Sequence, residues 1–98
     1  MKLPLVFHPE IEDDLIESQL YYSDKTPGLA KDFVREVRKA QKAIAANPKM
    51  HQIIWKTVRR SLVNRFPFGL FYRIHKDRIE VLAVYHHSRD PAGWQSRV

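Results

Sequence analysis

The strongest constraint on this fold is a helical repeat that stops at a proline. From Leu29 to Ile44, apolar residues recur at intervals of four, four, three and four positions, which places them on one face of an α-helix. Asn47 and Pro48 end the segment, because proline cannot continue the hydrogen-bond ladder and disfavours helix in the residue before it. The chain must therefore bury a long amphipathic helix against another element.

An earlier helix is expected to begin at Pro9, a residue suited to a first helical turn. Acidic residues crowd its first turns, where negative charge meets the positive end of the helix dipole. The turn after it contains Thr26, a candidate N-cap, followed by Pro27. Two helices so close in sequence predict an antiparallel hairpin. The expected apolar stripe of the earlier helix is Ile11, Leu15, Ile16, Leu20 and Tyr22.

Strand patterns lie on both sides of this hairpin. A short strand is expected over 3–7, and β-branched and aromatic residues predict strands over 58–63, 68–75 and 78–86. The last strand is apolar on both faces and therefore central, with Ile79, Val81, Ala83 and Tyr85 on one face and Leu82 and Val84 on the other.

These elements predict a single α+β domain over 1–98 with the order βααβββ. The helical hairpin is expected to pack on one face of a small, mostly antiparallel, twisted sheet. The other face of the sheet is expected to be at least partly open, and an open surface groove is the expected form of any site in a chain of this length.

Charge is distributed unevenly along the chain. The stretch from Val37 to Lys76 holds ten lysines and arginines and no acidic residue, whereas residues 1–36 carry eight acids against four bases. Such a concentration of positive charge points to a polyanionic partner. The alternative is a solvated basic face with no partner, because a sequence does not show whether these bases converge in space.

Several kinds of chemistry are not indicated. The sequence has no cysteine, which excludes disulfides and thiolate metal sites, and its five histidines lack the carboxylates or cysteines that a zinc site requires. No metal and no cofactor are expected. The apolar run at the N-terminus stops at His8 and Pro9, far short of the ~20 residues that cross a membrane. A cytoplasmic protein with no membrane partner is therefore expected.

Six short motifs are spread over nearly the whole chain. They are Pro27-Gly28-Leu29-Ala30, Asn47-Pro48, Arg59-Arg60-Ser61-Leu62-Val63, Arg65-Phe66-Pro67-Phe68, Leu70-Phe71-Tyr72-Arg73-Ile74 and Val84-Tyr85-His86-His87-Ser88-Arg89-Asp90-Pro91. In their order and spacing, these motifs resemble the RelE/ParE superfamily of toxins from type II toxin–antitoxin systems. The resemblance implies a RelE/ParE-like fold and a growth inhibitor of the plasmid-stabilisation type, neutralised by a cognate antitoxin in a hetero-oligomer.

The resemblance leaves two activities open. The RelE-like branch cuts messenger RNA on the ribosome, and the ParE-like branch inhibits DNA gyrase without being an enzyme. The ribonuclease branch usually has an arginine directly before the Leu-x-Tyr of its third strand, and Gly69 stands there in this sequence. This departure favours gyrase inhibition. Ribosome-dependent RNA cleavage is the alternative, and a non-toxic nucleic-acid-binding module is a third interpretation.

Candidate site residues follow from these activities. Cleavage by 2′-hydroxyl attack requires a base, an acid and cationic donors for the phosphate, roles for which this chain offers His86, His87, Arg89 and Arg73. In an extended strand the two histidines would point to opposite faces. For Trp94 and the Arg89-Asp90-Pro91 turn, anchoring of the C-terminal tail is the favoured role. Residues expected to bind a nucleic acid or an antitoxin are Arg59, Arg60, Arg65, Lys56 and Trp94.

Overall fold

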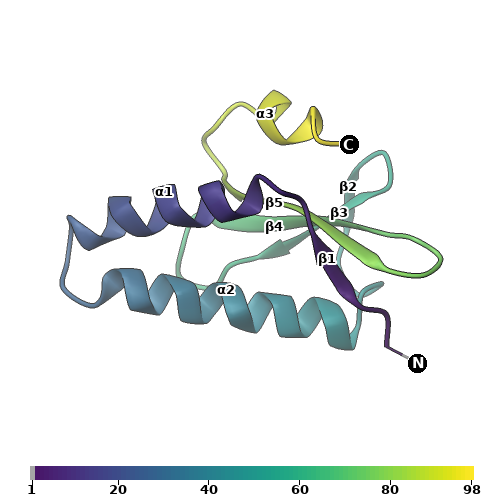
Figure 1. Cartoon of the computed structure of the whole chain (residues 1–98), viewed down its shortest axis with the longest axis horizontal. Coiled ribbons are helices and arrows are strands. Elements are labelled where there is room, and N and C mark those ends of the chain that lie inside the picture. Colours follow the sequence, from purple (N-terminus) through teal and green to yellow (C-terminus); the bar gives the residue numbers. More distant parts are fainter. Residues whose placement is uncertain (1) are drawn as a thin grey trace.

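The computed structural model describes residues 2–98 as a helical hairpin that lies across one face of a five-stranded sheet (Figure 1). The sheet order is β1-β5-β4-β3-β2, with β1 parallel to β5 and every other pair antiparallel. The α+β class, the hairpin and the interior position of the last strand are confirmed. The elements in chain order are β1 (Leu5–Phe7), α1 (Ile11–Ser23), α2 (Leu29–Ala46), β2 (Ile53–Trp55), β3 (Val58–Leu62), β4 (Phe68–Ile74), β5 (Ile79–His86) and α3 (Ala92–Gln95).

Two short elements, β2 and α3, add to the order expected from the sequence. Strand β2 has three residues and helix α3 has four, so neither is long enough to show a period of its own. Strand β2 is held by pairing with β3, where Ile53 faces Arg59 and Trp55 faces Val58. Both elements depend on tertiary contacts, which is why a pattern search overlooks them.

The helix starts differ from expectation by about two residues. Helix α1 begins at Ile11, after Pro9 and Glu10 have formed a turn, and Thr26 does not cap α2. Gly28 instead precedes α2 with φ 83°, a left-handed conformation that glycine adopts at little cost. The expected end of α2 is confirmed, since Asn47 leaves the helical conformation directly before Pro48.

The buried face of α1 is more polar than its apolar pattern suggests. Ile11 and Tyr22 are buried as expected, but Ile16 and Leu20 are 47% and 63% exposed. Asp14 and Ser18 face the protein interior instead. The Asp14 carboxylate accepts a hydrogen bond from the backbone N–H of Val84 at 3.1 Å. A polar residue on this face of α1 therefore satisfies a backbone donor of β5.

A β-bulge corrects the expected alternation of β5. Ala83 lies opposite Phe71 and Val81 lies opposite Tyr72, which leaves Leu82 as an extra residue in the strand. Residues after the bulge therefore point to the face opposite to the one that strict alternation predicts. Ile79, Val81 and Val84 therefore face the hairpin, and Leu82, Ala83 and Tyr85 face away from it.

The sheet has an apolar cluster on each face. The larger cluster lies between the sheet and the hairpin and includes Phe33, Ile44, Leu70 and Tyr72, all fully buried. We call the opposite side the outer sheet face. There the Trp94 ring of α3 stacks on Phe71 with ring centroids 4.5 Å apart, so α3 covers part of the face that was expected to be open.

No helix within residues 2–98 combines the length and apolarity needed to cross a membrane. The same residues contain no group of three histidine, cysteine or acidic side chains placed to hold a metal ion.

Candidate functional site

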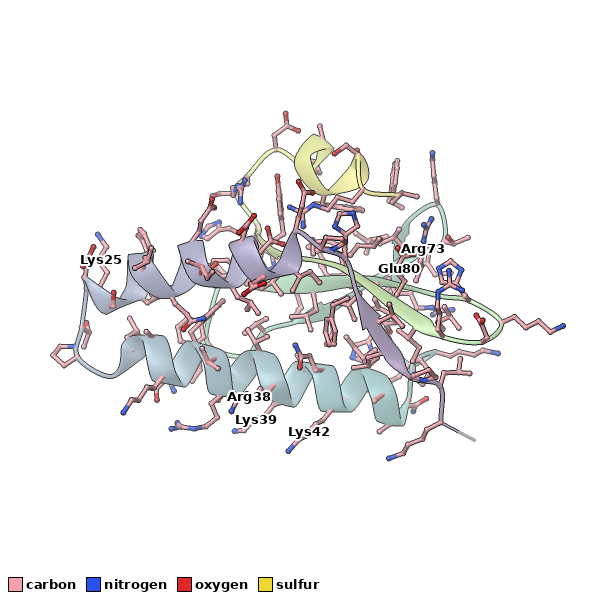
Figure 2. All side chains as sticks on the ribbon, viewed as in Figure 1. Lys25, Arg38, Lys39, Lys42, Arg73 and Glu80 are labelled. Atoms are coloured by element: carbon pink, nitrogen blue, oxygen red, sulfur yellow. The ribbon has the colours of Figure 1, made fainter. Side chains whose placement is uncertain are left out.

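The cations of the 37–76 stretch do not converge on one face. Arg38, Lys39 and Lys42 extend from α2 on the side away from the sheet, whereas Arg73 lies beside Glu80 near the β4–β5 turn (Figure 2). Arg60 projects from β3 onto the outer sheet face, where it lines a depression with residues that follow β5. The basic stretch of the sequence therefore does not form one continuous surface.

The depression on the outer sheet face has a volume of about 200 Å³ and gathers Arg60, His87 and Arg89. We call it the arginine–histidine depression. No acidic residue lines it, so its field attracts anions. Its remaining walls are Ile54, Phe71, Tyr85, His86, Pro91 and Trp94.

Gly69 makes room for one of these cations. Arg60 faces Phe71 across the β3–β4 ladder, and Gly69 is the diagonal neighbour on the same face. A Cβ atom on Gly69 would lie 2.9 Å from Cγ and 3.0 Å from Cδ of Arg60. The aliphatic part of the Arg60 side chain thus lies directly over Gly69.

The two adjacent histidines have different surroundings. Burial lowers the pKa of His87, and the nearby Arg60 and His86 lower it further, so His87 is mainly neutral at pH 7. Nδ1 of His86 accepts a hydrogen bond from the Ser88 N–H at 3.0 Å, and its ring lies against Phe68. The neutral imidazole of His87, in a depression that Arg60 and Arg89 also line, can accept a proton or donate a hydrogen bond to a phosphate oxygen.

The turn after β5 is held by Asp90. Asp90 Oδ1 accepts a hydrogen bond from the Ala92 N–H at 3.0 Å, and its backbone carbonyl accepts one from the Tyr85 hydroxyl at 2.7 Å. The Arg89 guanidinium lies 4.5 Å from the centre of the Tyr85 ring and remains exposed. Asp90 thus performs the expected anchoring of the tail, while Arg89 is left for a partner.

Arg73 is outside the depression. Its Nε donates to Glu80 Oε1 at 2.8 Å, and His75 Nε2 contacts the same oxygen at 2.8 Å (Figure 2). Burial tends to raise the pKa of Glu80, but the hydrogen bonds from His75 and Arg73 leave it lowered. Along β4, Arg73 is four residues from Gly69, which corresponds to ~13 Å. Arg73 is therefore remote from Gly69 and is paired with Glu80.

Of the remaining candidates, only Trp94 lies in the wall of the depression. Nη1 of Arg59 donates to the carbonyls of Lys49 and His51 at 3.1 and 2.7 Å, which ties down the segment before β2. Arg65 is 53% exposed, with its guanidinium 3.6 Å from Asp32. The Lys56 amine lies 4.5 Å from the Trp55 ring centre, in the β2–β3 turn. Trp94 is only 3% exposed, so little of its ring is accessible to a base.

Two cations outside the 37–76 stretch were not among the candidates. Lys31 and Arg35 continue the line of Arg38 and Lys42 along α2 at intervals of four, three and four residues. This spacing was visible in the sequence. Counting charge over the acid-free stretch hides this row, because that stretch begins at Val37 and leaves out Lys31 and Arg35.

Comparison with known proteins identifies the family. Residues 5–91 match the family model described as "ParE toxin of type II toxin-antitoxin system, parDE". Toxin ParE2 of Mycobacterium tuberculosis is 27% identical over 92 residues, covering 93% of this chain and 88% of the relative.

Two solved structures share the fold. A structure titled "Chromosomal ParDE TA system from P. aeruginosa" superposes with a TM-score of 0.76 at 20% identity, over 87% of this chain and 96% of that one. The YoeB dimer of Staphylococcus aureus gives a TM-score of 0.57 at 17% identity, over 89% and 99% of the two chains. With the family model matching most of its length, the chain belongs to the ParE toxin family of type II toxin–antitoxin systems.

Proposed function

We propose that this toxin inhibits growth by binding DNA gyrase and that it is not an enzyme. The observation that carries the proposal is Gly69, which stands where a ribonuclease of the superfamily would supply an arginine to the cleaved phosphate. Losing one preorganised donor to a transition state typically costs on the order of 100- to 1,000-fold in rate. A ribonuclease with this chain's sheet would have to recover that loss from other residues.

The neighbourhood of Gly69 supports the proposal further. Arg73, the next arginine on β4, is engaged by Glu80. The match to the ParE family model and the resemblance to ParE2 point in the same direction.

Ribosome-dependent RNA cleavage is the second candidate, because Arg60, His87 and Arg89 line one depression without a carboxylate. In that mechanism neutral His87 removes the proton of the 2′-hydroxyl, the 2′-oxygen attacks phosphorus, and the bond to the 5′-oxygen breaks. Arg60 and Arg89 stabilise the phosphorane charge. The departing 5′-oxygen needs a proton, for which the depression offers only His86 as an imidazole donor. Because Nδ1 of His86 accepts a hydrogen bond from the Ser88 N–H, that proton would have to come from Nε2 of the same ring.

Two readouts after induced expression separate the activities. Purified protein is assayed for inhibition of gyrase-dependent supercoiling, and messenger 5′ ends are mapped on ribosomes. We expect inhibited supercoiling and no codon-phased breaks. The variants His87→Ala and Arg89→Ala remove the candidate base and one of the two cations of the depression. Lys76→Ala and Arg78→Ala, in the β4–β5 turn, are the matched controls.

The outcomes are distinct. Codon-phased breaks that vanish in the His87 and Arg89 variants but persist in the control, with supercoiling intact, would make the chain a ribonuclease. Normal growth with folded, soluble protein would remove both toxic activities and leave the plain nucleic-acid-binding module. Both proposed targets are cytoplasmic, so the action is assigned to the cytoplasm.

A cognate antitoxin is the proposed physiological partner. The solved relatives include a ParDE system and a YoeB–YefM complex, in which a toxin of this fold occurs with a second protein. The candidate is a neighbouring reading frame of roughly 60–100 residues with a DNA-binding half and an amphipathic half. Co-expression should abolish toxicity and yield a stable complex; independent purification of the two products would argue against the pairing.

A further inference from the structure

A straight row of cations runs along the exposed face of α2. It consists of Lys31, Arg35, Arg38 and Lys42, which we call the α2 stripe, and these positions span about 60° of the helix. The stripe lies opposite the residues that α2 buries. Figure 2 shows Arg38 and Lys42 directed away from the sheet, with Lys39 beside them. The buried residues are Phe33, Glu36, Val37, Ala40 and Ile44.

Most of the stripe's charge is not neutralised within the protein. Arg35 pairs with Asp32 at 3.0 Å, whereas Lys31, Arg38 and Lys42 form no ion pair with any of residues 2–98. The two acids of α2 lie elsewhere: Glu36 is buried and Asp32 is half-buried beside Arg65. The stripe therefore has a net positive charge on an exposed helix face.

The neighbouring helix has the opposite character. The outward-facing residues of α1 include Asp13 and Glu17 together with exposed Ile16 and Leu20. An apolar surface suited to a protein partner is thus present on the hairpin, but on the other helix. The α2 stripe itself offers charge without a large apolar side chain.

We propose that the α2 stripe binds the sugar–phosphate backbone of duplex DNA, without reading sequence. The stripe covers ~16 Å along the helix axis. The same length of duplex presents about ten phosphate charges, so four cations meet an excess of partners in any register. Long, flexible lysine and arginine side chains on a rigid helix suit such contacts, because phosphate contacts position a protein without specifying bases.

Duplex DNA fits better than the other polyanions. Proteins that bind single strands usually stack bases on aromatic side chains, and the stripe has none. The B-DNA major groove is wide enough for a helix to lie in it with its side chains directed at the flanking phosphates, whereas the deep, narrow major groove of duplex RNA does not admit a helix. An acidic protein segment would bury apolar surface as well as charge. Near the stripe, only Ala30 and Val34 offer it, in a shallow groove shared with Gln19, Lys31, Arg35 and Arg38.

The inference is independent of gyrase, because DNA binding is measured without it. If gyrase is also the target, the stripe would concentrate the toxin on the nucleic acid on which that enzyme works. Failure of one experiment leaves the other result standing. Supercoiling inhibition tests the target, and direct DNA binding tests the stripe.

The experiment measures fluorescence anisotropy of a labelled duplex of about two helical turns against salt concentration. Wild-type protein is compared with Arg38→Gln/Lys42→Gln and with a control of equal charge change, Lys25→Gln/Lys76→Gln. Lys25 lies at the tip of the hairpin (Figure 2), and both control lysines are exposed. Thermal unfolding verifies that neither pair alters the fold.

The stripe pair should lower the slope of log affinity against log salt by about 1.8, the value for two lost phosphate contacts. Between about 50 and 200 mM salt, its affinity should therefore fall about tenfold less than that of wild type. The control pair should retain the wild-type slope.

Three results would overturn the proposal. Equal slopes for the two variant pairs would show that DNA binding depends on the net charge of the protein and not on the α2 stripe. Displacement of the duplex by single-stranded RNA of the same charge count would remove the preference for duplex DNA. Loss of antitoxin capture in the stripe pair, with DNA binding intact, would assign the surface to the antitoxin.

Discussion

Asp14 and Arg97 form a two-pronged ion pair across 83 residues of sequence, with Nη1–Oδ2 and Nη2–Oδ1 distances of 2.7 and 3.0 Å. Asp14 also accepts from the Val84 N–H, and Arg97 donates to the Leu82 carbonyl at 3.1 Å. Strand β1 pairs with β5 only over Ile79–Val81. Beyond that point the side chains of α1 and of the segment after α3 satisfy the free edge of β5 as a neighbouring strand would.

Arg97→Ala should destabilise the fold by about 3–5 kcal/mol, because it leaves the Asp14 carboxylate buried without its counter-ion. The two side chains are 9% and 6% exposed. Urea unfolding measures the loss. Arg78→Ala, which breaks the exposed pair with Asp77, is the control and should stay within about 0.5 kcal/mol of wild type. Similar losses in both variants would contradict a buried role for Arg97.

Gly69→Ala should destabilise the protein by about 1–2 kcal/mol, since the added Cβ would overlap the stem of Arg60. Adding Arg60→Ala should recover most of this loss, because the obstructing stem is then removed. A double-mutant cycle in urea measures the coupling. Independent, additive effects would show that Arg60 does not occupy the space over Gly69.

The stability of the protein should fall as the pH drops below about 6.5, the ordinary pKa of histidine. Burial lowers the pKa of His51, and the nearby Arg59 lowers it further, so the unfolded chain takes up this proton more readily than the folded one. The loss should level off below the folded-state pKa. His51 meets the Tyr72 hydroxyl at 3.0 Å, and burial raises the pKa of Tyr72 to about 12, which keeps that hydroxyl protonated.

Unfolding free energies at about pH 7.5 and 5.5 test this prediction. His51→Gln should flatten the dependence, and His8→Gln on the far edge of the sheet serves as the comparison. Some dependence should remain, because the pKa of His87 is lowered in the same direction. An unchanged pH profile in His51→Gln would contradict the assignment.

Association with the cognate antitoxin should slow on the order of tenfold at low salt in Arg60→Glu/Arg65→Glu. Both side chains are accessible, whereas Arg59 is held by two backbone carbonyls. Arg59→Glu is therefore expected to lower stability rather than association. Stopped-flow kinetics with Lys25→Glu/Lys76→Glu as the charge control provides the measurement. Equal rates in the two pairs would exclude these arginines from the interface.

Local signals account for what was predictable. The α2 repeat, its end at Asn47 and the strand patterns after Val58 each depend on neighbours within a few residues, and all are present in the structure. The packed position of Trp94 also agrees with the favoured interpretation, since a large aromatic ring gains most from burial.

The features that could not be predicted depend on contacts between residues far apart in the sequence. In the sequence, Asp14 looks like one of several acidic residues in the first turn of a helix. Its structural role depends on Arg97, which lies 83 residues away. The bulge at Leu82 depends on the register between β4 and β5, and the approach of Arg60 to Gly69 depends on the register between β3 and β4. No sequence window contains that information. For the same reason the sequence could name Arg60, His87 and Arg89 but could not bring them together.

The parallel pairing of β1 with β5 also bears on how the chain assembles. It joins Leu5 to Ile79, whereas the α1–α2 hairpin and the β3–β4–β5 meander connect neighbours in sequence. Closing so long a loop costs more entropy than closing the short ones. We expect the hairpin and the meander to form early and β1 to dock late. Until it docks, the outer edge of β5 is an unpaired template to which a strand of another molecule can add. Misassembly of this protein should therefore be concentrated in the interval before its first strand arrives.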